Sequence, residues 1–308
     1  MIWIFFKADI KNYIKNCIYK LKYKPCRAKH RNVYYCVFET HKKHAGLADR
    51  LKTVILQYDL AKASGYEFKL YWKTPFCLSE YLKPKTDWEC SLDDLEYSLL
   101  DTKIISEVSW RQRKLLKPGR QYHCYRYAGG QSPRILPFTG RKWVELFNEL
   151  FEPNERLIKA YNELGIPEHS YVAVHIRFVN ALEKFENTYF DNHLDSEEKR
   201  KELIERCKKG IKDIVDENPV KDVYVFSDSK VFLDSIYDLP VKVLDHDEVC
   251  HVSENSNSDT QLKSFLDMYV ISKASAVYRF QAPELLSSSG FSKVASNIGD
   301  IPFFNKKV

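Results

Sequence analysis

Short apolar runs alternate with longer amphipathic stretches throughout the second half of the chain. Each run is rich in β-branched or aromatic residues, and each following stretch repeats its apolar positions with a helical period. The expected strands are 171–175, 222–226, 241–244 and 276–280, and the expected helices are 196–217, 230–236, 260–273 and a final one after Ser292. Repeated β-α units of this length predict a parallel, doubly wound sheet with right-handed crossovers.

The first half begins with one clear unit of the same kind. We predict a strand at 33–38, a helix from Leu47 to a glycine cap at Gly65, and a second strand at 66–72. Residues 73–135 have mixed periodicity, which predicts only an irregular α+β segment. Residues 141–163 predict one long helix or a pair broken at Pro153. The Gly165-Ile166-Pro167 sequence that follows is the expected linker, so we predict domains at 32–165 and 166–308.

Residues 1–31 form a basic leader. Between residues 2 and 24, apolar side chains repeat with a helical period, and lysines occupy the opposite face. Such a helix can lie on an anionic membrane, with the aromatic residues near its start inserted. It can equally pack on the body of the protein with its lysines in solvent. Both interpretations remain open.

Composition places the chain among globular proteins. It has 308 residues, of which 44% are hydrophobic and 29% charged, enough for two domains. No run of about eighteen apolar residues is present, so we expect no membrane-spanning helix. The apolar start ends at Phe6 and does not resemble an export signal. The eight cysteines form no C-x-x-C pair, which favours reduced thiols in a cytosolic protein and argues against zinc.

The net charge of +6 is unevenly distributed. Seven lysines and two arginines against one aspartate give residues 1–31 a charge of +8, so the remaining residues together carry −2. A fold that binds nucleic acid would carry the excess on its folded body. We therefore expect no nucleic-acid partner, although the charge and the twenty tyrosines keep an RNA- or DNA-binding protein as an alternative.

The end of the strand that begins at Tyr171 carries the most informative polar side chains. His175, Arg177 and Asn180 follow an apolar run, and ligands in open α/β sheets bind beyond the carboxyl ends of strands. Arginine presents a planar fork of donors that matches a phosphate or carboxylate. The alternative is an arginine in a surface ion pair.

Other polar groups follow the neighbouring strands. Ser227, Asp228 and Ser229 end one strand, and serines up to Ser289 precede the last helix, where hydroxyls and N–H groups can bind phosphate or simply cap the helix. The loop from His44 to Leu51 places Gly46 at a helix start, a second anion site or a packing glycine.

Two further acidic motifs have alternative interpretations. Asp267 lies among apolar neighbours in a helix, where it needs a partner, either a guanine edge or a nearby lysine. Asp245-x-Asp247 has the form of a metal- and nucleotide-binding motif of one glycosyltransferase class, but aspartate pairs after strands are common.

Three motifs resemble the α-1,2/α-1,6 and protein O-fucosyltransferase superfamily over residues 33–70 and 171–299. Gly46-Leu47-Ala48-Asp49-Arg50-Leu51 looks like its glycine loop, and Val174-His175-Ile176-Arg177 looks like its H-x-R motif, whose arginine holds the β-phosphate of GDP. Phe226-Ser227-Asp228-Ser229 with Leu266-Asp267-Met268 resembles the stretch whose helical aspartate reads guanine ahead of a serine pair, here Ser288 and Ser289.

The resemblance implies an α/β, GT-B-like fold with two Rossmann-type domains facing a central cleft. It also implies metal-independent, inverting transfer of fucose from GDP-β-L-fucose to a hydroxyl of an oligosaccharide acceptor, with no cofactor. We expect Arg177 to stabilise the leaving diphosphate and Glu186 to act as the base, with Glu183 and His44 as alternatives. The expected donor-binding residues are His44, Gly46, Arg50, His175, Arg177, Asn180, Asp228, Asp267, Ser288 and Ser289.

The chain departs from the family pattern at several positions. The family's second arginine is replaced by Phe178, one of its two aspartates by Ser229, and residues 281–286 separate the last strand from the serines. The alternatives are therefore a GT-B enzyme with another nucleotide-sugar donor and a non-catalytic nucleotide- or glycan-binding relative. We expect a cytoplasmic location, peripheral on the inner membrane face.

Overall fold

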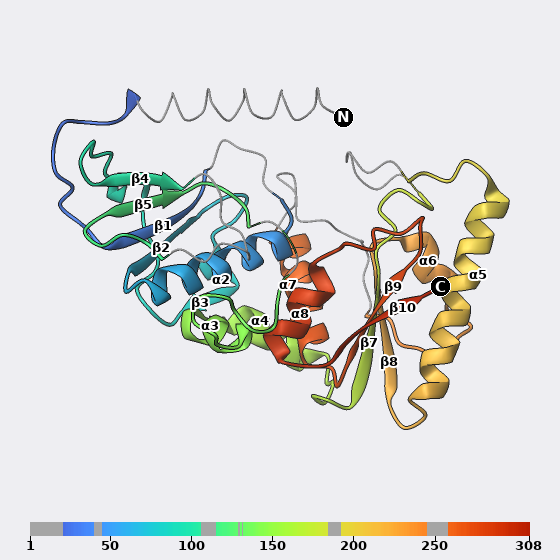
Figure 1. The fold of residues 1–308 in the computed structure, drawn as a ribbon. Helices are drawn as coiled ribbons and strands as arrows, with labels where there is room; N and C mark the ends of the chain where they lie inside the picture. The colour runs from blue at the N-terminus through green and yellow to red at the C-terminus, as the bar shows by residue number, and fades with distance from the viewer. Residues whose placement is uncertain are drawn as a thin grey trace.

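The computed structural model describes residues 21–39, 45–105, 115–128, 130, 132–183, 192–244 and 258–308. The described chain forms two parallel β-sheets with helices between them and on the far side of the second sheet (Figure 1). One sheet comes from the first half of the sequence and the other from the second. The predicted α/β class with two parallel sheets is confirmed.

The N-terminal sheet has the strand order β2-β1-β5-β4, all parallel. Every residue of its central strand β1 is buried, as its apolar sequence predicts. The predicted β-α-β unit forms, and its helix ends before Gly65, whose φ of +71° suits glycine. The strand bounds are β1 Val33–Phe38, β2 Glu67–Trp72, β4 Thr102–Ile105 and β5 Gln121–Cys124.

Strands β4 and β5 lie inside the segment that we predicted to be irregular. Both have only four residues, and β5 contains Gln121 and His123, so neither has an apolar run that identifies a strand. The two polar side chains are nevertheless fully buried, and they bond to each other. The neighbouring strands therefore determine this part of the sheet.

The C-terminal sheet has the order β10-β9-β7-β8, again all parallel. The predicted strand at 241–244 contributes one parallel bridge, from Lys242 to Tyr224 of β8, at the sheet's edge. The final strand β10 was not predicted. The bounds are β7 Tyr171–Ile176, β8 Asp222–Ser227, β9 Val277–Gln281 and β10 Phe303–Lys307.

Helices cover both faces of the C-terminal sheet (Figure 1). The outer face packs against α5 and α6 through residues such as Val174 and Leu203. The inner face packs against α7 and α8, as a doubly wound sheet requires. The helix bounds are α2 Leu47–Ala63, α3 Trp143–Leu150, α4 Glu155–Glu163, α5 Glu197–Glu217, α6 Lys230–Ser235, α7 Ser258–Ser272 and α8 Phe291–Gly299.

The predicted pair of helices around Pro153 is α3 and α4. They are separated by the short strand β6 (Phe151–Pro153), which pairs antiparallel with β3 (Leu82–Pro84). Two single 3-10 turns, Leu78–Glu80 and Leu92–Asp94, complete the described elements of this half.

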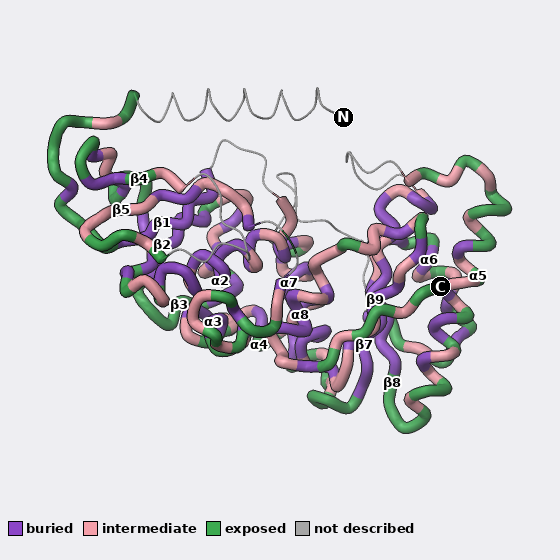
Figure 2. The backbone as a smooth tube through the Cα atoms, in the orientation of Figure 1, coloured by how far each residue is buried: buried purple, intermediate pink, exposed green. Residues whose placement is uncertain are grey.

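One hydrophobic core connects the two sheets. It extends from β1 and α2 through α7 and α8 to the inner face of β7, and Figure 2 shows this buried layer between the sheets. The Tyr81 and Phe265 rings stack at 4.4 Å across it. A Cβ on Gly299 would lie 1.9 Å from the carbonyl oxygen of Ser272, so α8 packs tightly on α7. The predicted boundary at residue 165 lies between the two sheets in the sequence, but this hydrophobic core includes residues from both sides of it. The division into two domains stays a prediction.

Among the described residues, no helix has both the length and the apolar character needed to cross a bilayer. Residues 1–20, which contain most of the predicted amphipathic leader, lie outside the described residues.

Candidate active site at the carboxyl edges of the two sheets

Arg177 follows directly after β7, at the point where the chain order of the C-terminal sheet reverses. From β7 the chain goes first to β8 on one side and later to β9 on the other. Ligands in open α/β sheets bind at such a switch point, beyond the carboxyl ends of the strands. The Arg177 side chain is 15% exposed, and its Nη1 lies 3.1 Å from Oδ2 of Asp228, which follows β8. The sequence therefore placed both residues at the correct edge of the sheet.

Asp228 organises the turn that carries Arg177. Its two carboxylate oxygens accept hydrogen bonds of 2.7 Å from the backbone N–H groups of Phe178 and Val179. Val179 has a φ of +58°, an uncommon conformation that these bonds hold in place. Burial raises the pKa of Asp228, while Arg177 and the N–H groups oppose that effect and favour the ionised form. We therefore assign Asp228 a positioning role beneath the site.

Asn192, which the sequence analysis did not consider, ties the same turn to the loop after β9. Its Nδ2 donates to the carbonyl oxygens of Phe178 and Glu284 at 2.6 and 2.7 Å, and its Oδ1 accepts from the N–H of Asn180 at 3.2 Å. The N–H of Leu286 also donates to the Arg177 carbonyl at 2.9 Å. The loops after β7, β8 and β9 thus form one bonded unit around Arg177.

His175 lies beneath this unit with a buried, neutral ring. Burial, together with Arg177 and Arg279, lowers the pKa of His175 to about 3. The ring stacks on Phe291 of α8 at 5.6 Å, and its Nδ1 has no hydrogen-bond partner within the described residues. His175 therefore joins β7 to the start of α8 and adds no charge near neutral pH.

Arg279 on β9 is a second buried cation that sequence reasoning missed. It is in register with His175 on β7 and with Asn305 on β10, so the three side chains share one face of the sheet. Its Nη1 donates to the Ser289 carbonyl at 2.7 Å, and its other donors reach Oδ1 of Asn305. The sequence signal was a charged residue within an otherwise apolar strand. Arg279 holds the serine loop directly before α8.

The N-terminal ends of α2 and α8 meet between the two sheets. A Cβ on Gly290 would lie 3.9 Å from the Cβ of Ala48 in the first turn of α2. Within the described residues, neither helix receives a side-chain cap, whereas Asn154 caps α4. The Ser292 hydroxyl in the first turn of α8 is fully buried without a hydrogen-bond partner in the described chain. Two uncapped positive helix ends form a site suited to an anion.

Arg50 in α2 has a different environment. It is 1% exposed, and it donates to the carbonyl oxygens of Ala45 and Thr74 at 2.8 and 2.7 Å. Its guanidinium also lies 5.0 Å from the centre of the Trp72 ring, a cation–π distance. Burial lowers the pKa of Arg50 to about 10. These contacts hold the loop that contains Gly46, the N-cap residue of α2.

The remaining expected residues have less defined positions. Asp267 is half-buried on α7, the helix that packs against α8, and Ser288 is exposed in the loop that Arg279 holds. Glu183, the alternative base, accepts a 3.4 Å bond from the N–H of Val231. His44, Glu186, Asp245 and Asp247 lie outside the described residues. In the described part of the chain, no group of three metal-binding side chains comes together.

Comparison with solved structures shows a shared fold. The chain superimposes on the NodZ α-1,6-fucosyltransferase soaked with GDP-fucose with a TM-score of 0.55 at 12% identity, covering 88% of this chain and 93% of that one. A structure of NodZ from Bradyrhizobium gives 0.55 at 12%, covering 87% and 92%. An Arabidopsis thaliana FUT1 mutant in complex with GDP gives 0.51 at 10%, covering 96% and 74%. This chain has the fold of the fucosyltransferases.

No protein-family model matches the sequence, and no curated protein matches it either. The similarity to these fucosyltransferase structures is therefore a similarity of fold. The sequence identity of 10–12% is too low for comparison of sequences to detect it. The resemblance noted from the three motifs agrees with the fold found by superposition.

Proposed function

We propose that the protein is a glycosyltransferase that moves fucose from GDP-β-L-fucose to a hydroxyl group of an oligosaccharide. The supporting observation is the position of Arg177, at the switch point of a fucosyltransferase fold and within a bonded unit that also carries the serine loop before α8. NodZ has been crystallised with GDP-fucose and FUT1 with GDP. Both likenesses favour a guanosine diphosphate donor.

The proposed chemistry is an inverting transfer in which negative charge develops on the departing diphosphate. Arg177 and the first N–H groups of α8 and α2 stabilise that charge because they are already oriented before the reaction. Asp228, Asn192 and Arg279 hold these donors in place. The proposal assigns no step to a metal ion.

Two roles in the proposal rest on sequence resemblance. Asp267 would accept hydrogen bonds from the guanine edge, and Glu186 would remove the proton of the acceptor hydroxyl, with Glu183 as the alternative. Glu183 already accepts a backbone hydrogen bond at the start of α6, which favours Glu186 for the catalytic task. We also propose a cytoplasmic location.

A binding screen by calorimetry tests the donor. We expect the full-length protein to bind GDP and GDP-fucose in preference to UDP and ADP, and Asp267→Asn to reduce this preference. A matched variant, Asp259→Asn, changes an exposed carboxylate at the start of the same helix and should leave the preference intact. Stronger binding of UDP or ADP would identify a GT-B enzyme with another donor.

Hydrolysis of GDP-fucose in the absence of an acceptor distinguishes an enzyme from a binding protein. We expect slow release of free fucose that Arg177→Ala abolishes. Tight GDP binding with no hydrolysis and no transfer to any oligosaccharide in an acceptor library would instead establish a non-catalytic relative.

A further inference from the structure

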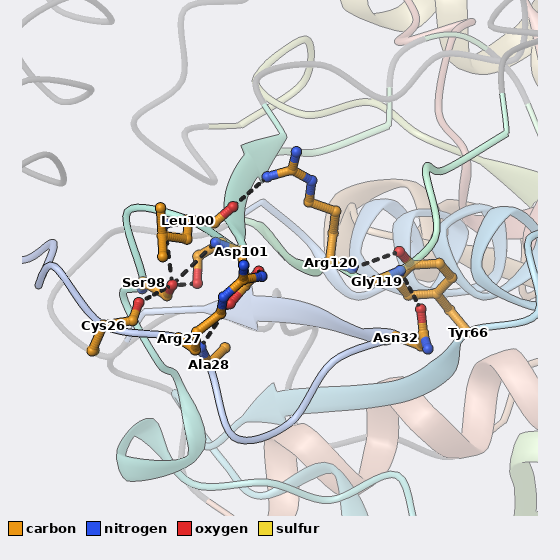
Figure 3. Close-up of polar contacts among 11 residues, drawn as sticks. Cys26, Arg27, Ala28, Asn32, Tyr66, Ser98, Leu100, Asp101, Gly119 and Arg120 are labelled. Atoms are coloured by element: carbon orange, nitrogen blue, oxygen red, sulfur yellow. Dashed lines mark hydrogen bonds and ion pairs between the residues drawn. The ribbon is translucent and has the colours of Figure 1, made fainter.

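Residues 22–31 are fixed to the amino end of the N-terminal sheet, where Lys24 bridges to Ser98. Figure 3 shows Arg27 and Ala28 of this segment beside Asp101. The Lys24 N–H donates to the Tyr97 carbonyl at 2.7 Å, and the Lys24 carbonyl accepts from the N–H of Leu99 at 3.0 Å. Further along, the Ala28 N–H donates to Oδ2 of Asp101 at 3.0 Å. The last ten residues of the predicted leader therefore pack on the body and have a defined position.

The segment neutralises the acidic groups that it meets. Asp101 is 3% exposed and is paired with Arg27 at 3.2 Å. Glu96 accepts from two backbone N–H groups of the segment, at residues 29 and 30. Burial opposes ionisation of Glu96, but these N–H groups outweigh it and lower its pKa. Asp101 and Glu96 are thus both bonded to this segment.

Several cations of the same region are exposed and form no ion pair with the part of the chain that the structure describes. The segment 22–31 contains five lysines and arginines and no acidic residue. Within the described residues, no carboxylate forms an ion pair with three of these five cations or with two exposed lysines near the strand starts: Lys24, Lys29, Arg31, Lys103 and Lys117. This end of the sheet therefore presents excess positive charge to solvent.

Exposed leucines lie among these cations. Leu99 and Leu100 are 56% and 52% exposed in the turn before β4, and Leu115 is 55% exposed shortly before β5. Leu21, at the start of the described chain, is 86% exposed. Arg120 donates to the Leu100 carbonyl, which joins the two loops (Figure 3). Large apolar side chains that project beside unpaired cations suit the boundary of a lipid bilayer.

We propose that this amino-edge surface binds an anionic phospholipid bilayer. The surface consists of Leu21, Lys24, Lys29, Arg31, Leu99, Leu100, Leu115 and Lys117, and the basic sequence of residues 1–20 continues from it. Cations supply attraction to anionic headgroups, and the leucines insert among the acyl chains. A polynucleotide would match the positive charge but has no apolar layer into which the leucines could insert.

The topology gives this surface a consequence for the proposed enzyme. The strands of the sheet are parallel, so the amino-edge surface and the start of α2 lie at opposite ends, about 20 Å apart along a six-residue strand. Binding to a bilayer through one end leaves the candidate active site at the other end accessible. The surface itself is independent of the donor and of the reaction.

The test is cosedimentation of the full-length protein with vesicles of phosphatidylcholine, with and without phosphatidylglycerol, at low and high salt. We expect binding that requires the anionic lipid and weakens with salt. Each lysine near a membrane surface contributes about fivefold to partitioning, so Lys24→Gln with Lys29→Gln should weaken binding roughly twentyfold or more. Leu99→Ser with Leu100→Ser should also weaken it at least about fivefold.

Matched variants on the opposite domain separate this surface from general effects. Lys199→Gln with Lys209→Gln removes two exposed lysines of α5, and Val220→Ser with Tyr237→Ser removes side chains that are 91% and 88% exposed. Both controls should bind vesicles as the wild type does. All four double variants should keep the wild-type melting temperature, because every changed side chain is exposed.

Three results would overturn the proposal. The first is unchanged vesicle binding by both amino-edge variants, and the second is an equal loss in the control variants. The third is that the amino-edge variants lose affinity for a single-stranded RNA oligomer while vesicle binding is retained, which would identify a nucleic-acid surface.

Discussion

Each sheet has an arginine near the carboxyl end of its first strand, but the two side chains have different surroundings. Arg50 of the N-terminal half is almost completely buried, between two backbone carbonyl groups and the ring of Trp72. Arg177 of the C-terminal half is partly exposed and pairs with a carboxylate. In sequence both were candidate donor ligands. The structure shows that Arg50 holds the loop at the start of α2, whereas Arg177 lies partly exposed at the switch point of the second sheet.

The difference shows that burial and partners decide what an arginine can do. The guanidinium of Arg50 already donates to two backbone carbonyl groups, through Nε and Nη1. Asp228 accepts two hydrogen bonds from the backbone of the turn as well as pairing with Arg177, so it fixes the arginine while part of that side chain stays exposed. A cation fixed in this way loses little conformational entropy when a diphosphate binds.

The largest expected effect follows from removing Arg177. One preorganised donor to a developing negative charge contributes about 3 kcal/mol, so Arg177→Ala should lower the turnover of fucosyl transfer about a hundredfold or more. Arg177→Lys, which keeps the charge and the pairing with Asp228, should recover part of the rate. Steady-state kinetics with GDP-fucose measure both, and wild-type turnover in Arg177→Ala would rule out the role.

Replacement of Arg50 should lower the stability of the fold and leave turnover nearly unchanged, which is the opposite of the effect expected at Arg177. Arg50→Met keeps much of the side-chain volume but removes two hydrogen bonds to carbonyl groups and the cation–π contact. We expect a loss of about 2 kcal/mol in the free energy of unfolding, with turnover per folded molecule changed less than about threefold. Denaturant unfolding and kinetics on the same sample measure the two quantities. A hundredfold loss of turnover at unchanged stability would place Arg50 with Arg177 as a donor ligand.

Each sheet contains one buried histidine whose low pKa should make the stability of the fold depend on pH. Burial lowers the pKa of His123 in β5 to about 3, and it lowers the pKa of His175 in β7 to a similar value. In the unfolded chain each imidazole takes up a proton near pH 6.5. Between these values the unfolded state binds more protons, so stability falls as the pH decreases, by about 1.4 kcal/mol per pH unit for each histidine.

Unfolding curves test this comparison. They should be measured from about pH 7 to about pH 5, which extends roughly one and a half pH units below the pKa of an unfolded histidine. His123→Gln and His175→Gln should each reduce the slope of stability against pH by about half of the histidine contribution. The wild-type protein is the reference for both variants. Slopes in both variants that equal the wild-type slope would contradict a neutral buried imidazole in either sheet.

The smallest expected effect concerns Asn192. Asn192→Ala removes its bonds to the Phe178 and Glu284 carbonyl groups, which join two loops around Arg177. We expect turnover to fall about fivefold, since a positioning bond of this kind contributes about 1 kcal/mol. Asn218→Ala removes a similar bond at the end of α5, far from the site in the fold, and should affect stability alone. A greater loss of turnover in Asn218→Ala would refute the positioning role.

The sequence predicted the parts of the fold that have strong local patterns. The buried strands β1, β7 and β8, and the amphipathic helices α4 and α5, lie close to their predicted bounds. The sequence did not predict β4, β5 or β10. Strands β4 and β5 have only four residues each and include polar ones, and β10 contains two lysines, so none of the three has an apolar run that identifies it. Those strands exist because a neighbouring strand satisfies their backbone groups, which is a non-local condition.

For the candidate site, the sequence identified residue types and strand ends. Arg177 and Asp228 were recognised from motifs, and parallel strands necessarily bring their carboxyl ends to one edge. The sequence could not show that Asp228 bonds the backbone of the Arg177 turn, that Asn192 supports the same turn, or that Arg279 holds the serine loop before α8. Each of these contacts joins segments between ten and fifty residues apart, so no local pattern encodes it.

The sequence alone determined the α/β class, the basic segment before the first strand and the polar side chains that end the strands of the second sheet. Those properties depend on hydrophobic period and charge, which can be read within a few residues. Only the tertiary structure decided that Arg50 is buried while Arg177 is partly exposed, that the starts of α2 and α8 meet, and that residues 22–31 lie on the sheet with leucines beside them. Such features depend on the groups, distant in sequence, that exclude water from a side chain and compete for its hydrogen bonds. Only the packing of the folded chain brings those groups together.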